Sequence, residues 1–357
     1  PLYPYLLALF TDAQGELNAG GVRLLQAGAG ALTAALVADL TARLTPIQPR
    51  IAGLAAGLLA ACYGPAIYFD SRILVAGLQT LLLTVAVWAL TVRDARVTGR
   101  AEQALVLTAG LSLGLAAALR PTTLAVVCAL VALPLLSLVR AGSLRSCARQ
   151  VLVRSALLVA GTLLAVLPFT VRNITVGGEV VLLSANGGLN FWIGNRATAD
   201  GLFRPPAGYD AVNDPLHRAA ASREAGRELD ARGASAWWRS RALDEIRESP
   251  GRWTGVMLRK LLLLPPPKEI PQLGSSFAWH RQGAWTLRLP VDGRYLLLLS
   301  LIAPFVLGSN LWRARWLLTA AAAYLATIAL FFVTGRYRAP VVPVSYTHLT
   351  LPTKVLG

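Results

Sequence analysis

Cysteine, histidine and methionine are scarce in this chain of 357 residues, which has three cysteines, three histidines and one methionine. The cysteines, Cys62, Cys128 and Cys147, lack the paired spacing of a disulfide framework or a zinc site. His217 and His280 have no second ligand at metal spacing, and no serine, histidine and acid pattern typical of nucleophilic catalysis stands out. The sequence therefore predicts neither a structural metal site nor a catalytic triad.

Negative charge is also scarce, because 18 acidic residues face 34 basic ones and the net charge is +16. Such a charge raises the question of nucleic-acid binding, but the basic residues gather in four short joints between apolar runs. The joints carry Arg43 and Arg50; Arg93, Arg96 and Arg100; Arg140, Arg145 and Arg149; and Arg313 and Arg315. Positive charge is retained on the cytoplasmic side of a membrane, and counting crossings from the start places all four joints on one side. The basic residues therefore predict which joints face the cytoplasm, and we expect no nucleic-acid partner.

Long apolar runs dominate the rest of the chain, which is 55% hydrophobic and 15% charged. A helix needs about 20 apolar residues to cross a bilayer core. Eight runs reach or approach that length: 22–40, 51–68, 73–92, 105–119, 122–139, 151–171, 295–307 and 316–333. Small residues at helical contact spacing, Gly53 with Gly57 and Gly110 with Gly114, are expected to let helices pack closely. The sequence predicts an all-α polytopic membrane domain of about eight spans.

The polar stretches give the expected organisation of the chain. Residues 1–20 are predicted to end a first extracytoplasmic loop, 21–171 to form six spans, 172–293 to form an extracytoplasmic loop subdomain, and 294–343 to form two spans and an outer segment. The loop subdomain is predicted to be mixed α/β, with a strand at Glu179–Ser184, helices at His217–Arg232 and Ser235–Glu248, and an interfacial helix around Met257–Leu264. Its tryptophans, Trp237, Trp238 and Trp253, are expected at the membrane interface.

Both ends carry expectations of their own. The chain begins with Pro1, and its one methionine is Met257, so we expect the true start to lie upstream. Val344 to Thr353, VSYTHLTLPT, resembles the translation of a sequencing adapter. We therefore expect residues 344–357 to be a non-native tail.

Charges at the edges of apolar runs cost about 2.5–3.5 kcal/mol on insertion scales and are site candidates by default. Asp70 and Arg72 share an outer turn, where they form either a surface pair or a metal or phosphate site. Arg120 lies at a second outer turn, where a snorkelling side chain is the alternative. Glu269, next to Lys268, is an acid, a base or an ion-pair partner.

The segment Gly335 to Pro340 is the sharpest cluster, because it places two arginines on the outer side, against the positive-inside bias. Arg336 and Arg338 suit bidentate capture of a phosphate, with Tyr337 as an anchor at headgroup level. An interfacial anchor for bulk lipid phosphates is the alternative.

Several segments together resemble bacterial members of glycosyltransferase family 39, in the GT-C superfamily. They are PLYPYLLALF at Pro1, YFDSR ending at Arg72, GLAAALRPT around Arg120, VRN and SANGGLNFWIGN between Val171 and Asn195, RALDEIRESPGRW and RKLLLL, KEIP around Glu269, and GRYRAPVVP. That family includes the protein mannosyltransferases and the lipid A aminoarabinose transferases. The resemblance covers most of the chain up to Pro343.

The resemblance implies transfer of a sugar from a polyprenyl-phosphate carrier to an extracytoplasmic lipid, glycan or protein acceptor, with inversion, in the bacterial cytoplasmic (inner) membrane. The family's catalytic aspartate is expected upstream of Pro1, and Asp70 matches a second acidic turn. Arg336 and Arg338 match a basic element near the lipid phosphate, while Arg172, Asn173 and Asn195 either line the acceptor side or hold turns. No cofactor is implied, and a divalent metal stays open. The competing functions are a flippase or transporter for polyprenyl-linked glycans and an outer-face glycan ligase.

Overall fold

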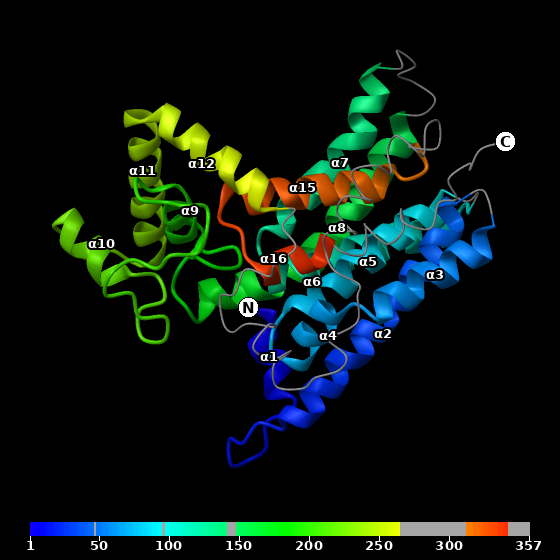
Figure 1. Cartoon of the computed structure of the whole chain (residues 1–357), viewed down its shortest axis with the longest axis horizontal. Helices are drawn as coiled ribbons and strands as arrows, with labels where there is room; N and C mark the ends of the chain where they lie inside the picture. Colours follow the sequence, from blue (N-terminus) through cyan, green and yellow to red (C-terminus); the bar gives the residue numbers. More distant parts are fainter. Residues whose placement is uncertain (46–47, 95–96, 141–147, 265–311, 342–357) are drawn as a thin grey trace. The chain divides into compact units, whose positions relative to one another are not determined.

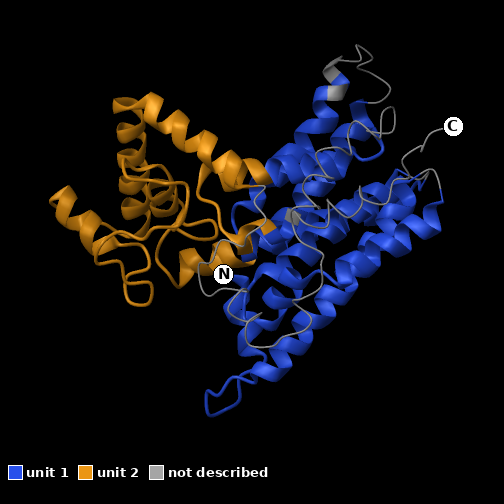
Figure 2. Ribbon diagram, viewed as in Figure 1, with its two compact units in different colours: residues 1–166, 274–324, 339–357 blue, residues 167–273, 325–338 orange. Residues whose placement is uncertain are grey.

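The computed structural model describes residues 1–45, 48–94, 97–140, 148–264 and 312–341, and most of these residues are helical (Figure 1). The chain divides into two compact units (Figure 2). Unit 1 comprises Pro1–Val166, Gly274–Tyr324 and Ala339–Gly357, and unit 2 comprises Leu167–Leu273 and Leu325–Arg338. The predicted boundary at residue 171 lies close to this division, but the return of residues 325–338 to unit 2 has no signal in the sequence.

Unit 1 is a bundle of helices. Its helices are α1 (Leu2–Ala8), α2 (Ala19–Leu44), α3 (Pro49–Ala61), α4 (Gly64–Ser71), α5 (Ala76–Arg93), α6 (Arg100–Leu119), α7 (Thr123–Arg140), the first part of α8 (Ala148–Thr175), the first part of α15 (Arg315–Leu330), and the 3₁₀ turn η3 (Ala339–Val341). α2 packs along α3 and α5, and α5 packs along α6.

Four helices are long and apolar enough to cross a membrane: α2, α5, α6 and α8. α3 and α4 together form a fifth candidate, bent by 49° at their junction, and α7 and α15 are shorter apolar helices. The chain is therefore a membrane protein with an all-α membrane domain, by the length and composition of these helices. The predicted run at 295–307 lies outside the described residues.

Glycines set the close approach of helices in unit 1. A β-carbon at Gly53 would lie 2.6 Å from the carbonyl oxygen of Ala38, and one at Gly57 would lie 2.9 Å from the β-carbon of Ala38. A β-carbon at Gly110 would overlap the carbonyl oxygen of Leu158 on α8. The packing role predicted for these small residues is confirmed, since no side chain fits between the backbones.

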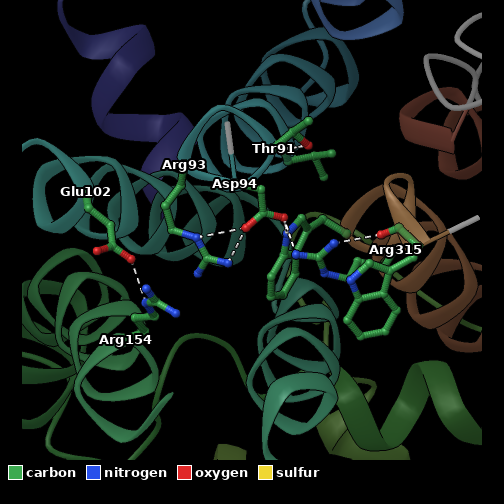
Figure 3. Close-up of polar contacts among 9 residues, drawn as sticks. Thr91, Arg93, Asp94, Glu102, Arg154 and Arg315 are labelled. Carbon is green, nitrogen blue, oxygen red and sulfur yellow. Dashed lines mark hydrogen bonds and ion pairs between the residues drawn. The ribbon is translucent and has the colours of Figure 1, made fainter. Parts of the chain in front are cut away.

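Ion pairs gather where α5 ends and α15 begins (Figure 3). The carboxylate of Asp94 accepts a hydrogen bond from Arg93 at 2.6 Å, from Trp316 Nε1 at 2.7 Å, and from Arg315. Glu102, near the start of α6, pairs with Arg154 on α8 at 2.6 Å. These contacts bring the joints at Arg93 and Arg315 to the same end of the bundle, as the charge count predicts for them.

Unit 2 contains the C-terminal parts of α8 and α15 with α9 (Gly187–Asn195), α10 (Arg218–Ala225), α11 (Ala231–Glu248), α12 (Pro250–Leu263) and α16 (Gly335–Arg338). Its core is built from α9, α10, α11 and the end of α15, around Leu189, Trp192, Trp238 and Phe332. Asp230 caps α11 by accepting a hydrogen bond from the amide of Gly233, and the carboxylate of Glu179 accepts from the amides of Ala231 and Arg232.

The predicted strand at Glu179–Ser184 does not form, and residues 167–264 and 325–338 contain no β-strand beyond isolated bridges. The reason is that side chains of α8 occupy the carbonyls that a neighbouring strand would need. Asn173 Nδ2 donates to the carbonyl oxygens of Val181 and Leu183, and Thr170 donates to that of Leu182. The mixed α/β expectation for this part of the chain is corrected to a helical one.

Two glycines inside α9 allow close contact with neighbouring segments. A β-carbon at Gly188 would overlap the carbonyl oxygen of Ser235 on α11, and one at Gly194 would overlap that of Phe331. Of the three tryptophans expected at the membrane interface, Trp238 is 1% exposed and belongs to the core of unit 2 instead. Trp237 and Trp253 are half-buried, and Trp253 Nε1 donates to Asn195 Oδ1 at 3.0 Å.

Candidate functional site

Asp70 is the most distinctive acidic side chain of unit 1. It lies in the last turn of α4, half-buried, with its carboxylate against α2 and α5. A β-carbon at Gly30 or at Gly77 would overlap one of its oxygens, so the two glycines leave the space that the carboxylate occupies. Among the described residues, no hydrogen bond or ion pair to this carboxylate is found. A half-buried acid without a partner retains its full capacity to accept a proton or a hydrogen bond.

The turn after Asp70 is held by Gln26, a fully buried residue of α2. Gln26 Nε2 donates to the carbonyl oxygens of Arg72 at 2.7 Å and Leu74 at 3.2 Å. Its Oε1 accepts from the hydroxyl of Tyr3 on α1 at 3.2 Å. Burial raises the pKa of Tyr3 to about 12, so the hydroxyl stays a donor at neutral pH. Gln26 thereby links the segment that begins at Pro1 to the YFDSR turn.

Three arginines of unit 1, Arg23, Arg72 and Arg120, lie around the same turn or at the end of α6. Arg23 Nε donates to the carbonyl oxygen of Ser71 at 3.1 Å. The guanidinium of Arg72 lies over the ring of Tyr68, 5.3 Å from its centroid. Arg120 ends α6, and its Nη1 lies 3.5 Å from the hydroxyl of Tyr324. Arg72 therefore has one face against an aromatic ring, while Arg120 is engaged at a different helix end.

The GRYR segment forms the short helix α16 in unit 2. Tyr337 stacks on Phe332 with ring centroids 5.6 Å apart and packs against the core of unit 2. Arg336 lies over the ring of Tyr337 at 5.2 Å, and Arg338 Nη1 donates to the carbonyl oxygen of Leu264 at 3.4 Å. Tyr337 thus packs against the core of unit 2 and supports the guanidinium of Arg336.

Asn195 is a structural centre of unit 2. Its Nδ2 donates to the carbonyl oxygens of Phe191 and Leu330, each at 2.8 Å, and its Oδ1 accepts from Trp253 Nε1 and from Lys260 Nζ, each at 3.0 Å. All four hydrogen-bonding positions of the amide are used. The residue is fully buried, so it lines no acceptor surface.

Of the remaining candidates, one has a structural role, one is exposed, and one lies outside the described residues. Asn173 Nδ2 holds the carbonyls of the segment after α8 through two hydrogen bonds, whereas Arg172 is exposed in the last turn of that helix. Glu269 lies outside the described residues. Within the described part of the chain, no group of three or more His, Cys, Asp or Glu side chains is placed to hold a metal ion.

Sequence reasoning missed Gln26, Tyr3 and Lys260. A buried glutamine in an otherwise apolar run is the one local signal that marks Gln26. Lys260 sits in an amphipathic helix beside Arg259, where nothing in the sequence distinguishes the buried cation from the exposed one.

Comparison of the chain with protein-family models, with curated proteins and with solved structures found no match.

Proposed function

We propose that the protein is a glycosyltransferase of the bacterial inner membrane that moves a sugar from a polyprenyl-phosphate carrier to an acceptor outside the cytoplasm. The proposal takes the eight predicted runs as spans and the end of the bundle with Asp70 as the extracytoplasmic one. The observation that carries it is the unpartnered carboxylate of Asp70, for which Gly30 and Gly77 leave room.

A carboxylate in this setting suits a proton acceptor. Sugar transfer from a lipid phosphate needs a group that takes the proton of the acceptor hydroxyl as the new glycosidic bond forms. It also needs cations that stabilise the phosphate as the sugar departs. Asp70 offers the first, and Arg72, two residues further along the chain, offers a guanidinium.

Arg336 and Arg338 are proposed as further phosphate ligands. Both are partly buried, and the ring of Tyr337 under Arg336 limits its freedom. An arginine held in place binds a phosphate at a smaller entropic cost than one on an open surface.

The decisive experiment measures transfer of a radiolabelled sugar from undecaprenyl phosphate in membranes containing the protein. Asp70→Asn should lower the rate at least tenfold, about 1.4 kcal/mol in the barrier, while the protein still inserts and melts normally. Arg336→Ala with Arg338→Ala should weaken donor binding. Glu16→Gln, an exposed acid of the same unit, is the matched control and should be neutral. If Asp70→Asn transfers sugar at the wild-type rate, Asp70 has a structural and not a catalytic role.

A flippase for polyprenyl-linked sugars is the second candidate, and one observation favours it. The α3–α4 pair is broken by a 49° bend and ends at a charged residue, Asp70. Interrupted helices that end in charged or polar groups are typical of transporters. A flippase would move a fluorescent polyprenyl-phosphate sugar across the membrane of a vesicle in the absence of an acceptor. It would also transfer no sugar when an acceptor is added, and these two results together would favour the flippase.

A further inference from the structure

The helix α12 of unit 2 (Figure 1) places its lysine and its leucines on the opposite sides to those expected in water. Lys260 is fully buried, and its Nζ donates to Asn195 Oδ1 at the end of α9. Leu258, Leu261 and Leu262 are 58%, 52% and 69% exposed. An amphipathic helix on a water-exposed surface buries its leucines and exposes its lysine. Because α12 does the reverse, its outer face is not suited to water.

The exposed leucines of α12 lie on one side of the helix. With 3.6 residues per turn, Leu258, Leu261 and Leu262 fall within an arc of about 100°, and Arg259 stands beside that arc. Lys260 lies on the far side of the helix. Half a turn about the helix axis would bury the leucines and expose the lysine, which water would favour. The orientation of α12 is therefore the one expected where the medium outside the leucines is itself apolar.

The charges of α12 complement a phospholipid surface. The helix has no acidic residue, and its basic residues are Arg252, Arg259 and Lys260. Arg252 donates to backbone carbonyls of unit 2 and Lys260 is buried, so Arg259 is the cation that the helix presents to the outside. An arginine beside an apolar face can keep its stem against hydrocarbon and its guanidinium at the level of the lipid phosphates. This combination is typical of a helix that lies in the membrane interface.

The helix α8 connects unit 2 directly to the membrane. It has 28 residues, and from Leu167 onward it belongs to unit 2. At 1.5 Å per residue it is about 42 Å long, against about 30 Å for the hydrocarbon core of a bilayer. The apolar run that predicts this span ends at Val171, inside unit 2, and both Leu167 and Val171 are exposed. Unit 2 therefore contains the point at which the chain leaves the membrane, so a lipid surface lies within its reach.

We propose that α12 docks on the lipid bilayer, with Leu258, Leu261 and Leu262 inserted at the boundary of headgroups and acyl chains and Arg259 at the phosphates of anionic lipids. The sequence predicts an interfacial helix here but not which side of it meets the lipid, because Arg259 and Lys260 are adjacent cations. The burial of Lys260 supplies that choice. Docking of α12 gives unit 2 a second attachment to the bilayer besides α8. It rests on the membrane character of the chain and not on the proposed transferase function.

The test measures how deep the leucine face lies in lipid. The full chain, with its three native cysteines changed to serine, carries a fluorescent label at Leu262→Cys or, as the matched control, at Val212→Cys. Val212 is an apolar residue of unit 2 that is 85% exposed. In nanodiscs of phosphatidylcholine and phosphatidylglycerol, quenchers fixed along the acyl chains should place the label at 262 about 5–10 Å into the boundary of headgroups and acyl chains. Iodide in the water should quench it severalfold less than the label at 212.

Substitutions around the label separate the two sides of α12. Leu258→Ser together with Leu261→Ser should raise iodide quenching at 262 to the level of the control site. Arg259→Gln should raise it more in discs with phosphatidylglycerol than in discs of phosphatidylcholine alone, because the cation is attracted to anionic lipid. Lys260→Met, which alters the buried side, and Arg239→Gln, which removes an exposed arginine of α11, should leave the quenching unchanged.

Equal iodide quenching at 262 and 212 would overturn the proposal, since the leucines would then face water. Protection from iodide without quenching by the labelled lipids would also overturn it, because another part of the chain or a second copy would then cover the face. Melting curves for each variant separate lost docking from a lost fold. Since no sugar donor is present, this result is independent of the Asp70→Asn transfer assay, and either proposal can fail alone.

Discussion

Replacement of Lys260 by methionine tests how a buried amine shapes the stability of unit 2. Lys260 is 0% exposed, and its Nζ donates to Asn195 Oδ1 at 3.0 Å, with Met257 Sδ at 3.8 Å. Among the described residues, no carboxylate pairs with it. Burial lowers the pKa of Lys260 from 10.5 to about 7, because the surroundings do not solvate the charged form.

The sign of the effect follows from proton binding. The folded protein loses the proton near pH 7 and the unfolded chain near pH 10.5, so the unfolded chain holds more protons between these values. Stability therefore rises with pH in this window, by up to about 1.4 kcal/mol per pH unit, and the full burial cost of about 5 kcal/mol is present below it. Lys260→Met removes this cost and loses one hydrogen bond worth about 1 kcal/mol, since Asn195 Oδ1 keeps Trp253.

The assay is thermal melting of the purified chain in detergent from about pH 7 to about pH 9.5. Near pH 7 the methionine variant should be more stable than wild type by about 2–4 kcal/mol, and this advantage should shrink as the pH rises. Arg259→Met removes the neighbouring, exposed cation and should keep the wild-type pH dependence. Equal pH slopes for wild type and Lys260→Met would refute the reasoning.

Two further substitutions probe packing and the ion pairs. Gly188→Ala should destabilise unit 2 by about 2 kcal/mol or more, because the new methyl overlaps the carbonyl oxygen of Ser235. Gly187→Ala, where the added methyl meets open space, is the control and should leave stability unchanged. Hydrogen exchange in α9 measures both variants, and equal effects would contradict the close approach of α9 to α11. Asp94→Ala should cost about 2 kcal/mol, since it removes the carboxylate that pairs with Arg315 and leaves the buried indole of Trp316 without its acceptor. An unchanged melting temperature would show that this cluster does not stabilise unit 1.

The membrane helices were the most predictable part of the fold. Crossing a bilayer demands a long apolar run, and this requirement is local, so α2, α5, α6 and α8 are confirmed from composition alone. The glycine pairs on α3 and α6 were predictable for the same reason, because their spacing is fixed by the helix. Unit 2 was not, since the strand expected at Glu179–Ser184 depends on which groups bond its carbonyls. Those groups lie on α8, and only the tertiary structure shows that Asn173 reaches them.

The candidate site likewise has features set by local sequence and features set by tertiary structure. Asp70 and the arginines were found because a charge beside an apolar run is costly wherever the chain folds. Their surroundings were not foreseen, because Gly30 and Gly77 become informative only when α2 and α5 are placed beside α4. For Asn195 the sequence left an acceptor-side role and a structural role open, since a motif records that a residue is present and not which of its atoms are already bonded; the structure shows the structural role.

Asp70 and Lys260 show why burial and access must be judged together. Each is an ionisable group with no oppositely charged partner among the described residues, so each carries a cost that the fold must offset. Lys260 is sealed and its Nζ donates to Asn195 Oδ1, so no substrate atom can reach it and its effect falls on stability. Asp70 is half-buried, and neither of its oxygens is bonded to a described residue. An acid kept in the fold at this cost is expected to act on another molecule, so Asp70→Asn should lose activity without losing stability, whereas Lys260→Met should gain stability without losing activity.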